Sequence, residues 1–211
     1  MAKQKKDVRT LGILCILALA GGIFSGCATI PAKNTSSAPT AMIARYAPTP
    51  VKIDGVLDDP VWKNAPSYPL LLAKDPFRYI NDPIATSMGP NLHEKGNVRL
   101  AWDEQFFYIA VEFEDSDVAA EGTGDQEHHY RNGDTLELFL KPGNKPWYWE
   151  LYATPHGKKT SFFFPSRGRY LPSVEKYRCD MRVGATVDGT LNDWSDRDNG
   201  WTAEMAVSIK D

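Results

Sequence analysis

Cysteine is scarce in this sequence, which excludes a fold held together by a disulfide framework. The 211 residues contain three cysteines, and two of them, Cys15 and Cys27, lie near the N-terminus. Only Cys179 is left for the rest of the chain, and one cysteine cannot form an internal bridge. A fold of this length is therefore expected to depend on an apolar core.

A concentration of positive charge is also missing. The formal net charge is −3 at pH 7, and no basic patch stands out along the chain. Nucleic-acid binding draws on such a patch, so nucleic acid is not an expected partner. No apolar run has the roughly 20 residues of a transmembrane helix, because the longest one covers only residues 11–24.

The N-terminus has the composition of a secretion signal. Lysines and Arg9 make a basic start, residues 11–24 form a short apolar region, and the small residues Ser25 and Gly26 follow. The sequence therefore predicts a signal peptide over residues 1–27 and an exported protein.

The end of this signal resembles the lipobox of bacterial lipoproteins. Residues 24–27 read FSGC, although Phe24 stands where the lipobox usually has an aliphatic residue. The resemblance implies that Cys27 is lipidated and becomes the new N-terminus, with acyl chains that anchor the protein to a membrane. Ala28 after the cysteine implies the outer membrane of the cell envelope. Ordinary signal cleavage near Ala28 is the alternative.

A segment without periodicity follows the signal. Residues 28–48 are rich in Ala, Pro, Ser and Thr. This composition buries too little surface to offset the entropy of ordering, so it predicts a flexible tether. The folded part is expected over residues 49–211, a length of roughly 160 residues that suits one core.

The rest of the chain alternates apolar and polar residues with a period of two, which predicts strands that bury one face. The predicted strands are 98–102, 107–113, 134–140, 147–154, 181–187 and 201–209. Residues 103–105 are expected to form a hairpin turn, and no long stretch has helical spacing. The pattern favours an all-β fold, an antiparallel β-sandwich of jelly-roll or immunoglobulin-like type.

The same alternation predicts which side chains face water. Residues 141–146 are a short connection, so the strands on either side are expected to pair as a hairpin. Their outward residues would form one patch of carboxylates and rings: Thr135, Glu137, Phe139, Tyr148, Glu150, Tyr152 and Thr154. Carboxylates beside aromatic rings suit a sugar, because its C–H faces stack on the rings and its hydroxyls donate to the acids.

Two alternatives to this patch stay open. A loop could cover the face, so that its aromatic side chains form a second small core. A register shift of one residue would turn Trp147 and Trp149 outward in place of Tyr148 and Tyr152. Trp194, in a polar loop, is a further candidate stacking ring.

Five motifs in order resemble family 9 carbohydrate-binding modules and their DOMON-like relatives. The segments are VKIDGVLDDPVW (51–62), VRLAWDEQFFYIA (98–110), EDSD (114–117), DTLELF (134–139) and GWTAEMAVSI (200–209). The resemblance covers residues 50–211 and implies a β-sandwich that binds oligo- or polysaccharides and holds structural calcium.

The resemblance also implies roles for individual residues. Glu137 falls on a carboxylate that hydrogen-bonds sugar hydroxyls, and Tyr130 or Arg131 lies near the position of a stacking tryptophan. Tyr152 and Thr154 fall near two polar sugar contacts. The second stacking tryptophan of the family lies beyond the strand that ends here at Ile209. The resemblance therefore implies either that the sequence is a fragment or that the final strands are absent, and without them a sheet edge is exposed.

Acidic residues and histidines suggest other chemistries. Asp115, Asp117 and Asp134 are candidate calcium ligands, because calcium takes oxygen donors. The pair His128-His129 lacks the further ligands that zinc needs. Glu137 and Glu150 could serve as the two acids of a glycosidase, but an open sheet face is poorly desolvated for acid catalysis.

The sequence therefore predicts a non-catalytic carbohydrate-binding lipoprotein of the cell envelope, with carbohydrate-active enzymes as possible partners. One alternative is a b-type haem protein of the same sandwich fold, in which Met88, Met181 or Met205 would pair with His128 or His129 as axial ligands. The other is a structural surface lipoprotein.

Overall fold

The computed structural model of the chain describes residues 41–71, 94–167 and 177–210. The expected signal peptide, Cys27, residues 28–40 of the expected tether and Met88 lie outside these ranges. No helix within the described ranges is long and apolar enough to cross a membrane.

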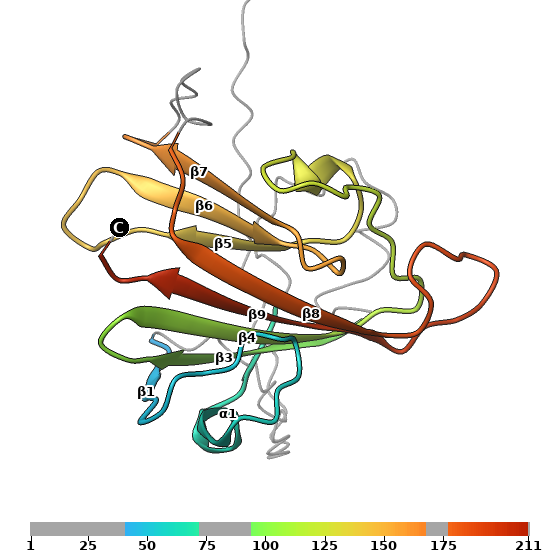
Figure 1. Cartoon of the computed structure of the whole chain (residues 1–211), viewed down its shortest axis with the longest axis horizontal. Helices are drawn as coiled ribbons and strands as arrows, with labels where there is room; N and C mark the ends of the chain where they lie inside the picture. The colour runs from blue at the N-terminus through green and yellow to red at the C-terminus, as the bar shows by residue number, and fades with distance from the viewer. Residues whose placement is uncertain (1–40, 72–93, 168–176, 211) are drawn as a thin grey trace, which may run out of the picture. The chain divides into compact units, whose positions relative to one another are not determined.

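The larger of two sheets has six strands, and its central strands are long (Figure 1). Its order is β1-β3-β4-β9-β8, and β2 also pairs with β3. All its pairs are antiparallel except β1 with β3. The strands are β1 (Arg45–Tyr46), β2 (Tyr68–Pro69), β3 (Gly96–Trp102), β4 (Phe106–Glu114), β8 (Met181–Asp188) and β9 (Gly200–Ser208).

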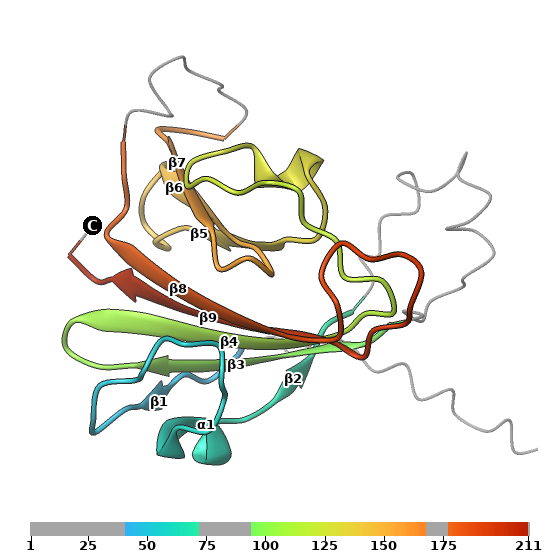
Figure 2. The same cartoon turned by 45° about the vertical axis from the view of Figure 1, so that its right-hand side comes forward.

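The second sheet has three antiparallel strands in the order β5-β6-β7. They are β5 (Leu136–Leu140), β6 (Tyr148–Ala153) and β7 (Lys159–Phe164). Figure 2 shows the two sheets as separate layers. The expected antiparallel β-sandwich is confirmed.

The main core lies between the two sheets. Alternate residues of β4, such as Ile109 and Val111, meet Leu151 of β6 and Met205 of β9, and all four are almost fully buried. The strand alternation read from the sequence thus gives the correct inward residues. Burial of such side chains is the main favourable term in folding, at roughly 25 cal/mol per Å² of apolar surface.

The N-terminal part of the fold covers the other face of the six-stranded sheet. The short helix α1 (Pro60–Asn64) has proline in its first turn and places Val61 and Trp62 against this face. Figure 2 shows α1 on the far side of the larger sheet from β5, β6 and β7. Strands β4 and β9 are therefore buried on both faces, which explains the small residues Ala110 and Ala206.

Two glycines allow this N-terminal segment to cross β8 at backbone contact. A Cβ atom on Gly184 would lie 2.6 Å from the Cα atom of Asp54, and one on Gly55 would lie 2.4 Å from the carbonyl carbon of Ala185. Gly55 also has a φ of +83°, in the left-handed region that favours glycine. Larger residues at either position would push the segment off the sheet.

The structure corrects two sequence-based expectations about this sheet. The alternation of the predicted strand 98–102 puts Trp102 on the inward face with Val98 and Leu100, yet 43% of its surface is exposed. Trp102 is the last residue of β3, and its ring packs edge-on against Tyr46. The tether was expected to reach residue 48, but β1 already pairs with β3 and Ala47 is buried. The folded part therefore begins at or before Arg45.

Candidate functional site

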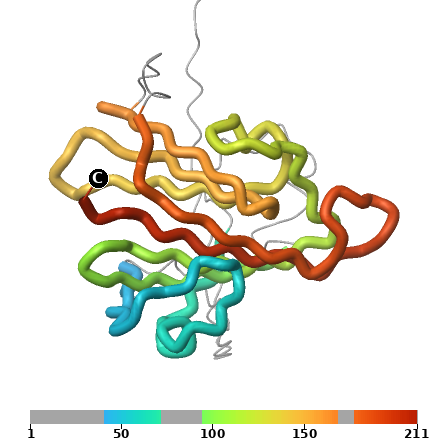
Figure 3. Tube along the Cα trace, viewed as in Figure 1, coloured from blue at the N-terminus to red at the C-terminus, as the bar shows by residue number. Residues whose placement is uncertain are grey.

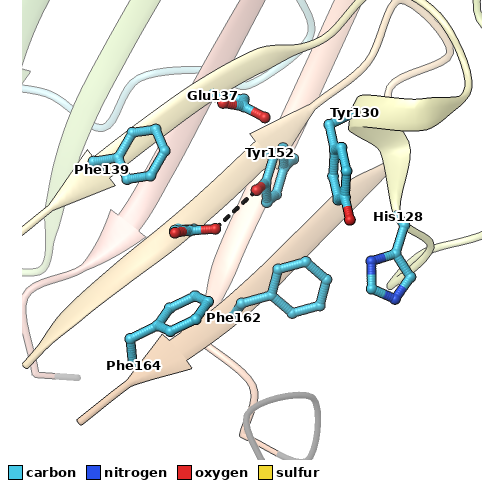
Figure 4. A pocket seen from close by; sticks show the side chains of 8 residues that line it. His128, Tyr130, Glu137, Phe139, Tyr152, Phe162 and Phe164 are labelled. Atoms are coloured by element: carbon cyan, nitrogen blue, oxygen red, sulfur yellow. Dashed lines mark hydrogen bonds between the residues drawn. The ribbon is translucent and has the colours of Figure 1, made fainter. Parts of the chain in front are cut away.

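A pocket of about 270 Å³ lies on the outer face of the three-stranded sheet, away from the main core. Figure 4 shows its side chains pointing toward one another from β5, β6, β7 and the loop before β5. Eight residues line it: His128, Tyr130, Glu137, Phe139, Glu150, Tyr152, Phe162 and Phe164.

Strand pairing brings the acids and the rings of this pocket together. Glu137 of β5 lies opposite Tyr152 of β6, and Phe139 lies opposite Glu150. On the other side of β6, Glu150 also pairs with Phe162 of β7. Residues directly opposite one another point to the same face of a sheet. The expected hairpin of β5 and β6, with its acids and rings on one outer face, is therefore confirmed.

The loop before β5 forms one wall of the pocket. It contains a short 3₁₀-helix, His129–Arg131, and runs beside the three-stranded sheet in Figure 3. The Tyr130 ring lies 6.2 Å from that of Tyr152, and the His128 ring lies 5.3 Å from that of Phe162, both measured between ring centroids. The wall thus extends the aromatic surface of the strands.

This loop makes the pocket deeper than an open sheet face. Tyr152 is only 3% exposed and forms a small buried cluster with Phe162, whereas Phe139 at the rim is 58% exposed. The open patch and the covering loop, two arrangements that the sequence allowed, are therefore each present in part. One end of the face is a covered aromatic cluster, and the other end, with Glu137 and Phe139, is open to solvent.

The buried tyrosine of the pocket is held by one of its carboxylates. The Tyr152 hydroxyl donates to Glu150 Oε2 at 3.0 Å (Figure 4). Burial raises the pKa of Tyr152 well above its usual value, and the negative charges of Glu150 and Glu137 raise it further. The hydroxyl consequently stays protonated and fixes the orientation of Glu150.

Three other residues named from the sequence do not line the pocket. The Arg131 guanidinium lies 5.1 Å from the ring centroid of Tyr130. Thr154 follows the last residue of β6, is 2% exposed, and accepts a hydrogen bond from the backbone of Lys158 in the turn. Trp194 is 90% exposed in the loop between β8 and β9. The register shift that would expose Trp149 does not occur, since Trp149 packs in the main core.

Sequence reasoning missed strand β7, which supplies two rings of the pocket. Its sequence KTSFFF is apolar on both faces, because Phe163 enters the core while Phe162 and Phe164 face the pocket. The Phe164 ring stacks on that of Tyr148 at 4.8 Å with an angle of 6°. The run of aromatic residues was the available signal, since such residues are enriched in strands.

The expected calcium ligands lie at the end of β4 and in the loop that follows. Burial and the charges of Asp134 and Glu94 raise the pKa of Asp115 to about 6. Asp134 accepts a hydrogen bond from the backbone of Ala119, and Asp117 is exposed. Within the described part of the chain, no three His, Cys, Asp or Glu side chains are grouped closely enough to hold a metal ion. A calcium ion here would need backbone or water oxygens as well.

Of the residues named for haem that the structure describes, Met181 and Met205 do not meet His128. Met181 and Met205 pack in the core between the sheets, whereas His128 lines the pocket on the opposite face of the three-stranded sheet. His129 is 1% exposed, and neither of its ring nitrogens has a hydrogen-bond partner. Burial lowers the pKa of His129, against the pull of Glu127 and Asp125, so its ring is held neutral.

Comparison with known proteins identifies the family. Residues 53–211 match the sequence model described as carbohydrate family 9 binding domain-like. The chain belongs to this family. No curated protein matched the sequence.

Solved structures include proteins of similar fold. A proposed carbohydrate-binding protein from Bacteroides uniformis has 12% sequence identity and a TM-score of 0.54, over 79% of this chain and 72% of that one. A family 9 module from Caldicellulosiruptor kristjanssonii, in complex with cellotriose, has 14% identity and a TM-score of 0.49, over 81% and 69% of the two chains. The same module in complex with glucose gives the same identity and TM-score.

Within this family 9-like domain, two of the motifs that carry the resemblance hold parts of the fold together. Glu204 of the GWTAE segment accepts hydrogen bonds from the indole nitrogen of Trp62 at 2.7 Å and from the backbone nitrogens of Asp54 and Gly55 at 3.0 and 2.9 Å. The first and last motifs therefore meet in one buried contact. Among the pocket residues, Glu137 and Phe139 alone belong to a quoted motif.

Proposed function

We propose that the pocket of the three-stranded sheet binds carbohydrate and does not cleave it. The observation that carries this proposal is the convergence of two carboxylates, Glu137 and Glu150, with five aromatic rings in one cavity. Rings stack on the C–H faces of a sugar, and carboxylates accept hydrogen bonds from its hydroxyls. Membership of a family of carbohydrate-binding domains supports the same function.

The size and shape of the pocket also suit a sugar ligand. Its volume of about 270 Å³ is close to the lower end of the range for small-molecule sites, which starts at roughly 300 Å³. Its open end at Glu137 and Phe139 leaves room for further sugar units to extend into solvent. The ligand class that we propose is therefore an oligosaccharide or a chain segment of a polysaccharide.

The decisive experiment compares two glutamates that differ in position. Glu137 is exposed at the pocket, and Glu104 is exposed in the turn between β3 and β4 of the other sheet. A glycan array followed by calorimetric titration should show binding that Glu137→Ala abolishes and Glu104→Ala leaves unchanged, with both melting temperatures close to wild type. A large loss of stability in Glu137→Ala would mean that this glutamate is structural, and wild-type protein that binds no glycan would refute the proposed function.

We also propose that the domain acts at the cell envelope, tethered through a lipid on Cys27 and close to carbohydrate-active enzymes. The sequence FSGC at residues 24–27 and the basic, then apolar residues before it support this location. Cell fractionation tests it: wild-type protein should sediment with membranes, and Cys27→Ala should be recovered in the soluble fraction. Equal partitioning of the two proteins would contradict the lipid anchor.

A structural calcium ion near Asp115 and Asp134 is a further part of this proposal. Its support is the raised pKa of Asp115, which comes from burial first and then from the negative charges of Asp134 and Glu94. A bound divalent cation would offset their repulsion.

A further inference from the structure

We infer that the pocket prefers a sugar that carries a protonated amine over the same sugar in neutral form, and that it rejects acidic sugars. This inference rests on the proposed function and narrows it to a ligand class. It follows from the charges that line the pocket and from the arrangement of its rings.

Two carboxylates carry the negative charge of the pocket lining, and His128 is the only basic side chain among the eight lining residues. Glu137 and Glu150 lie diagonally across the pairing of β5 and β6, so their side chains project from the same face. Residues placed in this way are roughly 7–8 Å apart, close enough for one ligand to contact both. The eight lining residues include no lysine or arginine. Two carboxylates in a partly closed cavity attract a cation more strongly than they would in open water.

Two arginines that the structure describes lie close to rings of this face and outside the lining. Arg131 packs on Tyr130, and Arg167 is exposed beyond the end of β7, where its charge acts on Tyr148. Neither side chain is among the residues that line the pocket.

The aromatic side chains add a second attraction for a cation. Tyr130, Tyr152 and Phe162 surround the closed end of the pocket, and the Tyr130 and Tyr152 rings lie 6.2 Å apart. An ammonium group held over aromatic faces gains a cation–π interaction, which strengthens when water is excluded. Rings and carboxylates together form the kind of site that holds an amine, whereas a neutral hydroxyl uses only the carboxylates.

The hydroxyl of Tyr152 does not provide a site for an anion. It donates a hydrogen bond to Glu150 Oε2, and this contact fixes the carboxylate beside the rings. A uronic acid in the same position would place its own carboxylate next to Glu137 and Glu150 and would be repelled. The expected order of affinity is therefore the amine-bearing sugar first, its N-acetylated form second and a uronic acid last.

The test uses short oligosaccharides that differ in one group. Glucosamine oligomers and N-acetylglucosamine oligomers of equal length share their backbone, and only the former carry amines that can be protonated. Calorimetric titration at pH 7 and low salt should give an affinity about tenfold higher for the glucosamine oligomer, as expected for one charge-assisted contact. The preference should shrink as salt screens the charges. Galacturonic acid oligomers should bind more weakly than either.

Charge-neutral variants assign the preference to the pocket. Glu137→Gln and Glu150→Gln keep hydrogen-bonding capacity but remove one charge each, and each should bring the two affinities within about threefold. Glu104→Gln, the same change on the other sheet, should retain the full preference. Retention of the preference in the Glu137 and Glu150 variants would overturn the inference, because the amine would then be attracted to the acidic protein as a whole.

The outcomes separate this inference from the proposed function. Binding of neutral and amine-bearing sugars with equal affinity overturns the preference and leaves carbohydrate binding intact. Binding of no sugar of any charge overturns both. A tighter fit for the N-acetylated oligomer also overturns the inference and would show that the pocket selects by shape.

Discussion

Glutamate residues on the outer faces of the two sheets have opposite surroundings. On the six-stranded sheet, Glu204 is fully buried beneath the N-terminal segment, and three donors of the protein satisfy it. On the three-stranded sheet, Glu137 and Glu150 line a pocket open to solvent. One face is closed by the chain itself and the other is open to a ligand. The family motifs therefore serve two purposes, since GWTAE holds the N-terminal segment on its sheet, whereas DTLELF contributes Glu137 and Phe139 to the pocket.

The largest effect is expected on the closed face. Glu204→Ala would leave the Trp62 indole and the backbone nitrogens of Asp54 and Gly55 without their acceptor. Buried donors that lose their partner cost about 1–3 kcal/mol each, so we expect a loss of at least about 3 kcal/mol in the free energy of unfolding. Denaturant titration measures it.

The same substitution at an exposed glutamate is the control for Glu204→Ala. Glu104→Ala should stay within about 0.5 kcal/mol of wild type, as exposed substitutions usually do. If the Glu204→Ala protein were as stable as Glu104→Ala, the buried contact would contribute nothing to the free energy of unfolding. The contrast between the two faces would then be wrong.

A substitution on the open face of the three-stranded sheet should change the binding affinity and leave the free energy of unfolding almost unchanged. Phe139 is 58% exposed at the rim of the pocket, so Phe139→Ala removes a stacking surface without opening a cavity in the core. We expect affinity for a bound oligosaccharide to fall about tenfold and the free energy of unfolding to change by less than about 0.5 kcal/mol. Titration calorimetry and thermal melting test the two parts. An unchanged affinity would remove Phe139 from the site.

Lowering the pH should reduce the free energy of unfolding through His129, which adjoins the wall of the pocket. Its pKa is lowered by burial in the fold, so below about pH 6.5 the unfolded chain takes up a proton more readily than the folded one. Stability contributed by the neutral ring is complete above that pH and is lost as the pH falls below it. His129→Phe, which cannot be protonated, should lose about 1 kcal/mol less than wild type between pH 7.5 and pH 5.5.

Unfolding curves at the two pH values provide the check. Equal losses in wild type and His129→Phe would show that His129 is not the group responsible. Because Tyr130 adjoins His129 and forms the pocket wall, binding should weaken over the same pH range.

The smallest effect concerns Asp115. Burial, and then the charges of Asp134 and Glu94, raise its pKa to about 6. The ionised carboxylate therefore destabilises the fold at neutral pH, and this cost is relieved as the pH falls through 6 toward the ordinary value of 3.8. In calcium-free buffer at pH 7.5, Asp115→Asn should be more stable than wild type by up to about 1 kcal/mol after solvent screening. Calcium should raise the melting temperature of wild type more than that of the variant. No rise in wild type would refute the calcium proposal.

The sandwich could be predicted from the sequence because most strands bury one face only. In β5 Leu136, Leu138 and Leu140 pack against the main core, whereas Glu137 and Phe139 between them are exposed. This alternation with a period of two predicts a strand. The hairpin of β5 and β6 was predictable for a second reason, since the short connection at residues 141–146 fixes both pairing and faces. The acids of the pocket followed from that pairing.

The features that were missed lack such a signal. Strand β7 buries Phe163 on one face and Phe162 on the other, so its apolar residues do not alternate. The expected strand 147–154 ran one residue too far, because a turn with Gly157 at a φ of +68° follows Ala153 and buries Thr154. The depth of the pocket depends on where the loop with His128 and Tyr130 packs, and this is set by tertiary contacts.

The central claim is that carbohydrate binds on the three-stranded sheet. The most direct measurement is an NMR titration of isotope-labelled protein with the oligosaccharide that binds best in an array. We predict that the backbone amides of β5, β6 and β7 shift, those of Glu137 and Glu150 most of all, while the amide of Glu204 does not. Shifts centred on the six-stranded sheet or on the loop of Trp194, with the three-stranded sheet unchanged, would contradict the account.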